Sequence, residues 1–295
     1  MRINPVTINN LNFTSTSRTK YKNIGTDEEY IKPYYSAYED YIAFMEGRNP
    51  AYSVVKIVNS NQTSFFRDDI NDWLVYAKRI DEAFKGADKV NVYDFGCSDG
   101  SEPYTLAISL IEALGEEGAE KYFPIKAMDK DPFIIYSAKK GEICCTKKDF
   151  ERINQNTGYK FDKYFEILHN KQNGDKIISP KEILRSKVEF SRKNATEGLS
   201  EVEPENSLVL TRNFLPYLSE DELKETVIQM RKLKDSSRIL IGDFDHEYSD
   251  GRVPWFLIHN GILEDGLFLK TDSKQISKRS DDDIRSDKYF GYSDD

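Results

Sequence analysis

Residues 90–114 read Val-Asn-Val-Tyr-Asp-Phe-Gly-Cys-Ser-Asp-Gly-Ser-Glu-Pro-Tyr-Thr-Leu-Ala-Ile-Ser-Leu-Ile-Glu-Ala-Leu, which predicts a strand, a glycine turn and a helix in direct succession. Val90 and Val92 alternate with polar residues, as is typical of a strand, and the proline after the turn suits a first helical turn. Gly96 and Gly100 bracket the turn, where the backbone can take unusual dihedrals and let a ligand come close. Because α/β proteins hold nucleotide-like ligands where a strand runs into such a turn, the stretch predicts both an α/β fold and a ligand site.

The spacing of this turn narrows the choice of ligand. It is neither the Gly-x-Gly-x-x-Gly of a dinucleotide site nor the Gly-Lys-Ser/Thr ending of a phosphate loop. The remaining pattern, Asp-x-Gly-Cys-x-x-Gly at 94–100, resembles the first motif of class I methyltransferases, which use S-adenosylmethionine. Together with Ser-Glu-Pro-Tyr-Thr at 101–105, it resembles the string Gly-Cys-Ser-x-Gly-x-Glu-Pro-Tyr-Ser of the CheR family, the chemotaxis-receptor glutamate methyltransferases.

The composition of the chain excludes several other classes of protein. The 295 residues suffice for one large domain or two modest ones. A net charge of −9 argues against a general nucleic-acid binder, since phosphate binding needs a basic surface.

No apolar run approaches the roughly 20 residues that span a bilayer, and we see no secretion signal. The cysteines Cys97, Cys144 and Cys145 fit neither a disulfide framework nor a zinc site. We therefore expect no metal, no membrane insertion and a cytoplasmic location.

The order of patterns along the chain predicts a short N-terminal region followed by one long domain. Residues 1–60 have the composition of a polar arm and one or two short helices, and residues 61–295 form the predicted main domain. Strands alternate with helices in that domain, which implies a mostly parallel sheet with helices on both faces. Residues 281–295 are rich in aspartate and are predicted to form a solvated, frayed acidic tail.

The resemblance to the CheR family extends from about residue 60 to about residue 245. Asn-Gln-Thr-Ser-Phe-Phe-Arg at 61–67 resembles the family's Asn-x-Thr-x-Phe-Phe-Arg, and Thr-Arg-Asn-Phe-Leu-Pro-Tyr-Leu at 211–218 resembles its Cys-Arg-Asn-Val-x-Ile-Tyr-Phe. Matches at 127–141 and 188–194 keep the family order. The resemblance implies a class I, Rossmann-like methyltransferase sheet with a small β insertion at 141–187. It also implies S-adenosylmethionine as cofactor, S-adenosylhomocysteine as product, and a protein substrate such as a signalling receptor.

Asp129 is the residue best placed to hold the ribose of such a cofactor. It ends the second predicted strand, where a carboxylate can accept hydrogen bonds from both ribose hydroxyls, and the alternative is a loop acid or helix cap. Glu102 can face the cofactor's ammonium or sulfonium, or be only a first-turn acid favoured by the helix dipole. The resemblance implies cofactor contacts at these and further positions: Asn61, Thr63, Arg67, Gly96, Glu102, Asn194, Ala195, Arg212 and Asn213. Asn194 can bind adenine edges or serve only in a turn.

Arg67 and Tyr217 are, by resemblance, the residues that position the reacting group. An arginine can hold a carboxylate through two parallel hydrogen bonds, and a tyrosine hydroxyl can orient an acceptor oxygen. The alternatives are that Arg67 pairs with a neighbouring aspartate at 68 or 69, and that Tyr217 is an ordinary core residue. Asp94, at the end of the first predicted strand, is interpreted as an organiser of the backbone turn.

The expected chemistry needs no general base. A glutamate carboxylate has a reference pKa of about 4.3, so it is ionised near neutral pH and can attack a sulfonium methyl directly. Catalysis then consists of alignment and exclusion of water, which agrees with the lack of an obvious catalytic His or Cys in the motifs.

Two departures from the family pattern leave other functions open. Residues 27–47 are acidic rather than basic, and Gly-Asp-Phe-Asp at 242–245 stands where the family has Gly-x-Ser-Glu. The competing hypotheses are a methyltransferase with a different acceptor and a non-catalytic signalling module that binds the cofactor or a peptide. In the second, the β insertion would add a peptide strand at an exposed edge.

Overall fold

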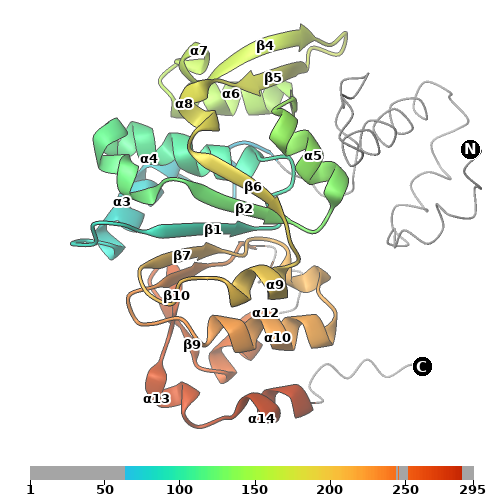
Figure 1. Cartoon of the computed structure of the whole chain (residues 1–295). Helices are drawn as coiled ribbons and strands as arrows, with labels where there is room; N and C mark the ends of the chain where they lie inside the picture. Colours follow the sequence, from blue (N-terminus) through green and yellow to red (C-terminus); the bar gives the residue numbers. More distant parts are fainter. Residues whose placement is uncertain (1–63, 244, 246–251, 288–295) are drawn as a thin grey trace, which may run out of the picture.

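The computed structural model describes residues 64–243, 245 and 252–287, in which helices cover both faces of a seven-stranded sheet (Figure 1). This confirms the predicted α/β class. The predicted N-terminal region at 1–60 and the candidate residues Asn61 and Thr63 lie outside the described residues.

The main sheet is mostly parallel, as predicted. Its strand order is β6-β2-β1-β7-β8-β10-β9, and only β10 runs antiparallel to its neighbours. The strands are β1 (Asn91–Phe95), β2 (Ile125–Asp129), β6 (Val188–Arg192), β7 (Ser207–Leu210), β8 (Arg238–Leu240), β9 (Ile262–Asp265) and β10 (Phe268–Thr271). The inner strand β1 pairs with β2 on one side and with β7 on the other, so the chain reverses its direction of winding there. Open α/β sheets bind ligands at the carboxyl ends of strands at such a reversal.

Two layers of helices bury the sheet. Figure 1 shows α3 (Trp73–Ala83), α4 (Ser101–Ala119) and α5 (Pro132–Lys140) on one face, and α9 (Ala195–Ser200), α10 (Glu220–Met230) and α12 (Arg252–His259) on the other. Strand β1 contributes to both cores, because Val92 packs into the first and Tyr93 into the second. The apolar character of the strand on both faces follows from this double cover. No helix in the described ranges is both long and apolar enough to cross a membrane.

The glycine turn between β1 and α4 forms as the sequence predicts. Gly96 and Gly100 both have positive φ, +76° and +93°, a region that glycine enters without steric cost. The N–H groups of Gly96 and of the next residue donate to the carbonyl of Met128, at 2.8 and 3.1 Å, which ties the turn to β2. A Cβ on Gly100 would lie 2.8 Å from the ring of Phe190. The turn is therefore a tightly packed corner of the sheet.

The predicted start of α10 is also confirmed. The Ser219 hydroxyl accepts from the Glu222 N–H and the Glu222 carboxylate accepts from the Ser219 N–H, which is a capping box. Leu223, Val227 and Met230 are buried along one face of the helix.

A second, three-stranded sheet lies apart from the first at the top of Figure 1. Its order is β3-β5-β4, and both pairs are antiparallel. Its elements are β3 (Ile143–Cys145), α6 (Lys147–Asn156), α7 (Phe161–Tyr164), β4 (Phe165–Asn170), β5 (Lys176–Pro180) and α8 (Glu182–Arg185). Strand β4 is an edge strand, and all of its residues after Phe165 are exposed, including Ile167 and Leu168.

The described part of the predicted acidic tail is not frayed, which corrects the prediction. After α13 (Ser273–Ile276), residues Asp281–Ser286 form helix α14, whose start is closed by a capping box on Ser280. Ile284 is fully buried against the second core. The aspartates of the first turn lie where the helix dipole favours negative charge. The acidic residues here therefore stabilise the start of a helix and do not form a solvated coil.

Candidate cofactor site

Asp129 lies at the carboxyl end of β2, beside the glycine turn. Its two carboxylate oxygens accept from the backbone N–H groups of Ser98, at 3.2 Å, and Asp131, at 2.9 Å. Burial raises the pKa of Asp129, and these two N–H donors oppose that rise. Each oxygen keeps a further lone pair with which to accept from a ligand. Asp129 therefore shapes the turn and presents acceptors at its mouth.

Asp94 does not organise the turn, so that interpretation was wrong. It sits in β1 with its side chain fully buried, and neither carboxylate oxygen has a hydrogen-bond partner among the described residues. The backbone of the turn instead bonds to Met128 and Asp129. Burial, reinforced by the neighbouring Glu102, raises the pKa of Asp94 well above its usual range.

Arg212 joins three segments of the chain beneath the turn. Its guanidinium donates to Glu102 Oε2 and to Asp69 Oδ2, both at 2.6 Å, and lies 5.1 Å from the ring centre of Trp73. The Arg212 side chain is only 2% exposed. Despite the loss of solvation, the two carboxylates raise the pKa of the guanidinium, which stays charged. We call Asp69, Glu102, Arg212 and Asn213 the Arg212 cluster.

Asn213 completes this cluster and is held by Asp245. The Asn213 amide nitrogen is 3.2 Å from Asp69 Oδ2, and its backbone takes φ of +60°. Asp245 is fully buried and accepts from the N–H groups of Asn213, Leu215 and Gly242 at 2.7 to 3.1 Å. Burial raises the pKa of Asp245 to about 6. The sequence interpretation did not assign Asp69 or Asp245 to the site, although Asp245 stands where the family pattern has its glutamate.

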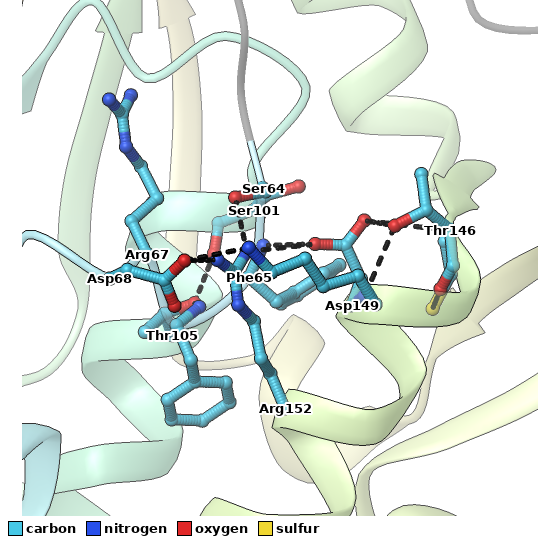
Figure 2. Close-up of polar contacts among 12 residues, drawn as sticks. Ser64, Phe65, Arg67, Asp68, Ser101, Thr105, Thr146, Asp149 and Arg152 are labelled. Carbon is cyan, nitrogen blue, oxygen red and sulfur yellow. Dashed lines mark hydrogen bonds and ion pairs between the residues drawn. The ribbon is translucent and has the colours of Figure 1, made fainter.

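The segment that carries Arg67 is fastened to the second sheet and to α4 (Figure 2). The N–H of Phe65 donates to Asp149 Oδ1 on α6, and the N–H of Phe66 donates to the Thr105 hydroxyl on α4, each at 3.1 Å. Arg152 contacts the Ser64 hydroxyl and the Asp68 carboxylate. The backbone before Arg67 is therefore held by elements on both sides.

Removing this fastening is expected to cost stability. In Asp149→Ala, the buried N–H group of Phe65 loses its acceptor, as does the more exposed N–H group of Thr146, and leaving a buried donor unpaired costs about 1–3 kcal/mol. Urea unfolding should show this loss in the free energy of unfolding. The matched control is Asp68→Ala, whose exposed ion pairs are worth less than about 1 kcal/mol. Equal effects of the two substitutions would contradict the assignment.

The two residues proposed to position the acceptor differ in their surroundings. The Arg67 side chain extends away from the network that fastens its backbone (Figure 2). It is 31% exposed, and its Nε lies 3.9 Å from Asp69 Oδ2, which is a loose ion pair of the kind considered as the alternative. Tyr217, in the short helix η3 (Leu215–Tyr217), is 59% exposed and is therefore not a core residue.

Asn194 and Ala195 follow β6 at the same end of the sheet. The Asn194 side-chain oxygen accepts from the Glu197 N–H at 2.7 Å and caps α9, whose first residue is Ala195. The turn chemistry considered as the alternative is thus present, and any recognition of adenine by Asn194 would use its amide NH2 group.

The described ranges contain cysteines and other groups that could ligate a metal. The three cysteines are buried and free, and no group of three or more His, Cys, Asp or Glu residues there is arranged to hold a metal ion.

Comparisons with known proteins agree with this geometry. The family model for the S-adenosylmethionine-binding domain of CheR methyltransferases matches residues 61–249. The chain is 25% identical over 214 residues to a chemotaxis protein methyltransferase of Borreliella burgdorferi, which covers 70% of this chain and 72% of the relative. It is 24% identical over 196 residues to chemotaxis protein methyltransferase 1 of Pseudomonas aeruginosa, covering 64% and 67% of the two chains.

A solved structure of magnesium protoporphyrin IX methyltransferase from Synechocystis, with bound SAH, is also similar. It shares 13% identity, covers 75% of this chain and 77% of that one, and has a TM-score of 0.28.

The family match spans well over half of the sequence and includes the glycine turn, Asp129 and the Arg212 cluster. The chain therefore belongs to the CheR methyltransferase family, and it is an enzyme that uses S-adenosylmethionine.

Proposed function

We propose that this enzyme transfers a methyl group to a glutamate side chain of a signalling receptor protein, forming a methyl ester and S-adenosylhomocysteine. The relatives' names, chemotaxis protein methyltransferase, support a protein acceptor in signalling. The observation that carries the proposal is that Arg67, a partly exposed cation, lies 3.9 Å from Asp69 of the Arg212 cluster. Tyr217, four residues after Asn213 of that cluster, is exposed as well. A cytoplasmic location is part of the same proposal.

The residues at the turn fit this cofactor. Asp129 presents carboxylate acceptors suited to the two ribose hydroxyls, and the backbone of Gly96 and Gly100 lets a ligand approach closely. Asp69, Glu102 and Asp94 give the site more carboxyl groups than Arg212 pairs with, which suits a ligand with cationic groups. We also assign Arg67, Asn194, Ala195, Arg212 and Asn213, with Asn61 and Thr63, to this site.

The protein's own contribution to the reaction is positioning. When bound, the cofactor supplies a methyl group activated by a sulfonium. Arg67 would hold the acceptor carboxylate through charge-assisted hydrogen bonds, and the Tyr217 hydroxyl would orient the attacking oxygen. The acceptor is ionised near neutral pH, so no side chain has to remove a proton. Alignment and exclusion of water are sufficient.

The stability of the product tests the proposal. The full-length protein is incubated with cofactor labelled in the methyl group and with candidate receptor proteins, and the labelled protein is then treated with mild base. A methyl ester of glutamate releases the label as methanol. Label that resists base would contradict the ester and favour a different acceptor atom.

The exposed edge of β4 supports a second candidate function, a module that binds a peptide without methylating it. Ile167 and Leu168 are exposed on this edge strand, and an extended peptide could pair with its backbone. Tight binding of S-adenosylhomocysteine and of a receptor segment, without turnover on any candidate protein, would favour this function over the first.

Replacing Asp129 is expected to weaken cofactor binding by about 10–100-fold, since a hydrogen bond to a charged group contributes about 1.5–3 kcal/mol. Calorimetry with S-adenosylhomocysteine on Asp129→Ala and on the parent protein measures this loss. Asp272→Ala is the matched control, because Asp272 also accepts from two backbone N–H groups but caps α13, remote from the turn. An unchanged affinity in Asp129→Ala would remove Asp129 from the site.

A further inference from the structure

Asp94 is an unusual group to find in the core of the sheet. It is fully buried in β1, and neither of its oxygens is bonded by an N–H or O–H of the described residues. A buried charge normally has a paired cation or several donors, because removal from water is costly. The side chains of Asp94 and Glu102 interact, so the partner of this buried acid is another acid.

The cations near this pair do not balance its charge. The charged groups that act on the pair are Arg212 after β7, Asp129 at the end of β2, and Asp69 and Arg67 before α3. Arg67 lies 3.9 Å from Asp69 Oδ2, so its charge offsets that of Asp69. Arg212 is already shared between Glu102 and Asp69, at 2.6 Å from each. Cys97 in the turn contributes a thiol whose pKa burial raises, so it stays neutral. Ionisation of both Asp94 and Glu102 would therefore leave one buried negative charge without a cation.

We propose that Asp94 and Glu102 share one proton before the cofactor binds, and that the ligand's ammonium group takes the place of this proton, which is released. The inference rests on the cofactor site proposed above. Two carboxyl groups in contact and out of water cannot both ionise easily, and a hydrogen bond between them requires a proton on one of them. The proton belongs to the pair and not to either residue.

The exchange makes Asp94 a determinant of which ligands bind. A ligand with an α-ammonium group restores the charge balance when the proton leaves, and an adenosine sulfur compound without that group does not. Burial and the neighbouring carboxyl group of Glu102 both raise the pKa of Asp94 well above its usual range. Binding of the ammonium ligand is therefore linked to pH in a defined direction, with higher affinity as the pH rises toward the pKa of the pair.

Calorimetry in buffers with different ionisation enthalpies measures the proton directly. The full-length protein is titrated with S-adenosylhomocysteine in phosphate and in imidazole, at about pH 6.5, where the ligand's α-ammonium and α-carboxylate keep their charges. We expect release of about one proton, and an affinity that increases about tenfold per pH unit on the acid side of the transition. 5′-Methylthioadenosine, which lacks the amino-acid part, should bind without proton release.

Asp94→Asn is the matching variant, because it keeps the shape of the protonated acid and cannot ionise. It should bind S-adenosylhomocysteine more weakly and release almost no proton. If the variant does not fold, the comparison of the two ligands on the parent protein still decides the question. Binding of S-adenosylhomocysteine with the same heat in both buffers, or equal release with 5′-methylthioadenosine, would overturn the inference and leave the site assignment intact. No binding of S-adenosylhomocysteine at all would overturn the site assignment, and this inference with it.

Discussion

Arg212→Met is expected to lower the free energy of unfolding by about 3–5 kcal/mol, the cost of breaking a buried ion pair from one side. The substitution keeps most of the side-chain volume but leaves Glu102 and Asp69 without the guanidinium that both contact at 2.6 Å. Urea unfolding of the variant and the parent protein measures the difference. Binding of S-adenosylhomocysteine should be lost at the same time.

The destabilisation by Arg212→Met should depend on pH. Burial already raises the pKa of Glu102 in the parent protein, and loss of the Arg212 charge, which opposes that rise, raises it further in the variant. The folded protein then binds more protons than the unfolded one, so the stability of the variant falls as the pH rises through that interval. The deficit should therefore be larger at alkaline than at acidic pH.

Arg231→Met provides the matched control for this pH dependence. Arg231 is as buried as Arg212, but it donates to the backbone carbonyls of Ile276 and Arg279 and to the half-exposed carboxylate of Asp281. Its loss should destabilise the protein without leaving a buried acid, so the deficit should change little with pH. The same pH profile for both variants would contradict the account of the Arg212 cluster.

Arg67→Ala is expected to reduce kcat/KM for methyl transfer by about 10²–10³-fold, the range for loss of a group that positions the reactants. The backbone of residues 64–66 is fastened by Asp149, Thr105 and Arg152 and should remain in place. Initial rates of base-labile methyl incorporation, measured with saturating cofactor, give the effect on acceptor use.

Arg79→Ala, which removes an exposed arginine from α3, is the control for the change in surface charge. It should leave the rate unchanged. If Arg67→Ala turned over at the rate of Arg79→Ala, the proposed role of Arg67 in positioning the acceptor would be wrong.

Local signals in the sequence were enough to predict the fold around the site. Short-range geometry governs each of these signals, which are the alternation in residues 90–95, the two glycines of the turn and the proline at the helix start. The place of Asp129 followed from its position at the end of a strand, because parallel strands present their carboxyl ends at one edge. The capping box at Ser219 and Glu222 was equally local, since its two residues are three apart.

The arrangement of charge in the site could not be predicted in this way. The partners of Arg212 are 110 and 143 residues away in the chain, and only the folded topology brings them together. The sequence around Asp94 shows an acid at a strand end, where a role in the turn is common, and gives no sign that its donors are absent. Helix α14 was missed because its acidic composition resembles that of a solvated tail, although a single buried Ile284 anchors it.

A crystal structure of the full-length protein with S-adenosylhomocysteine tests the central claim most directly. We expect the ligand at the carboxyl ends of β1 and β2, with the ribose hydroxyls on Asp129 and the α-ammonium group at the Asp94–Glu102 pair. A ligand bound elsewhere on the molecule, with Asp129 in contact only with the N–H groups of Ser98 and Asp131, would contradict it.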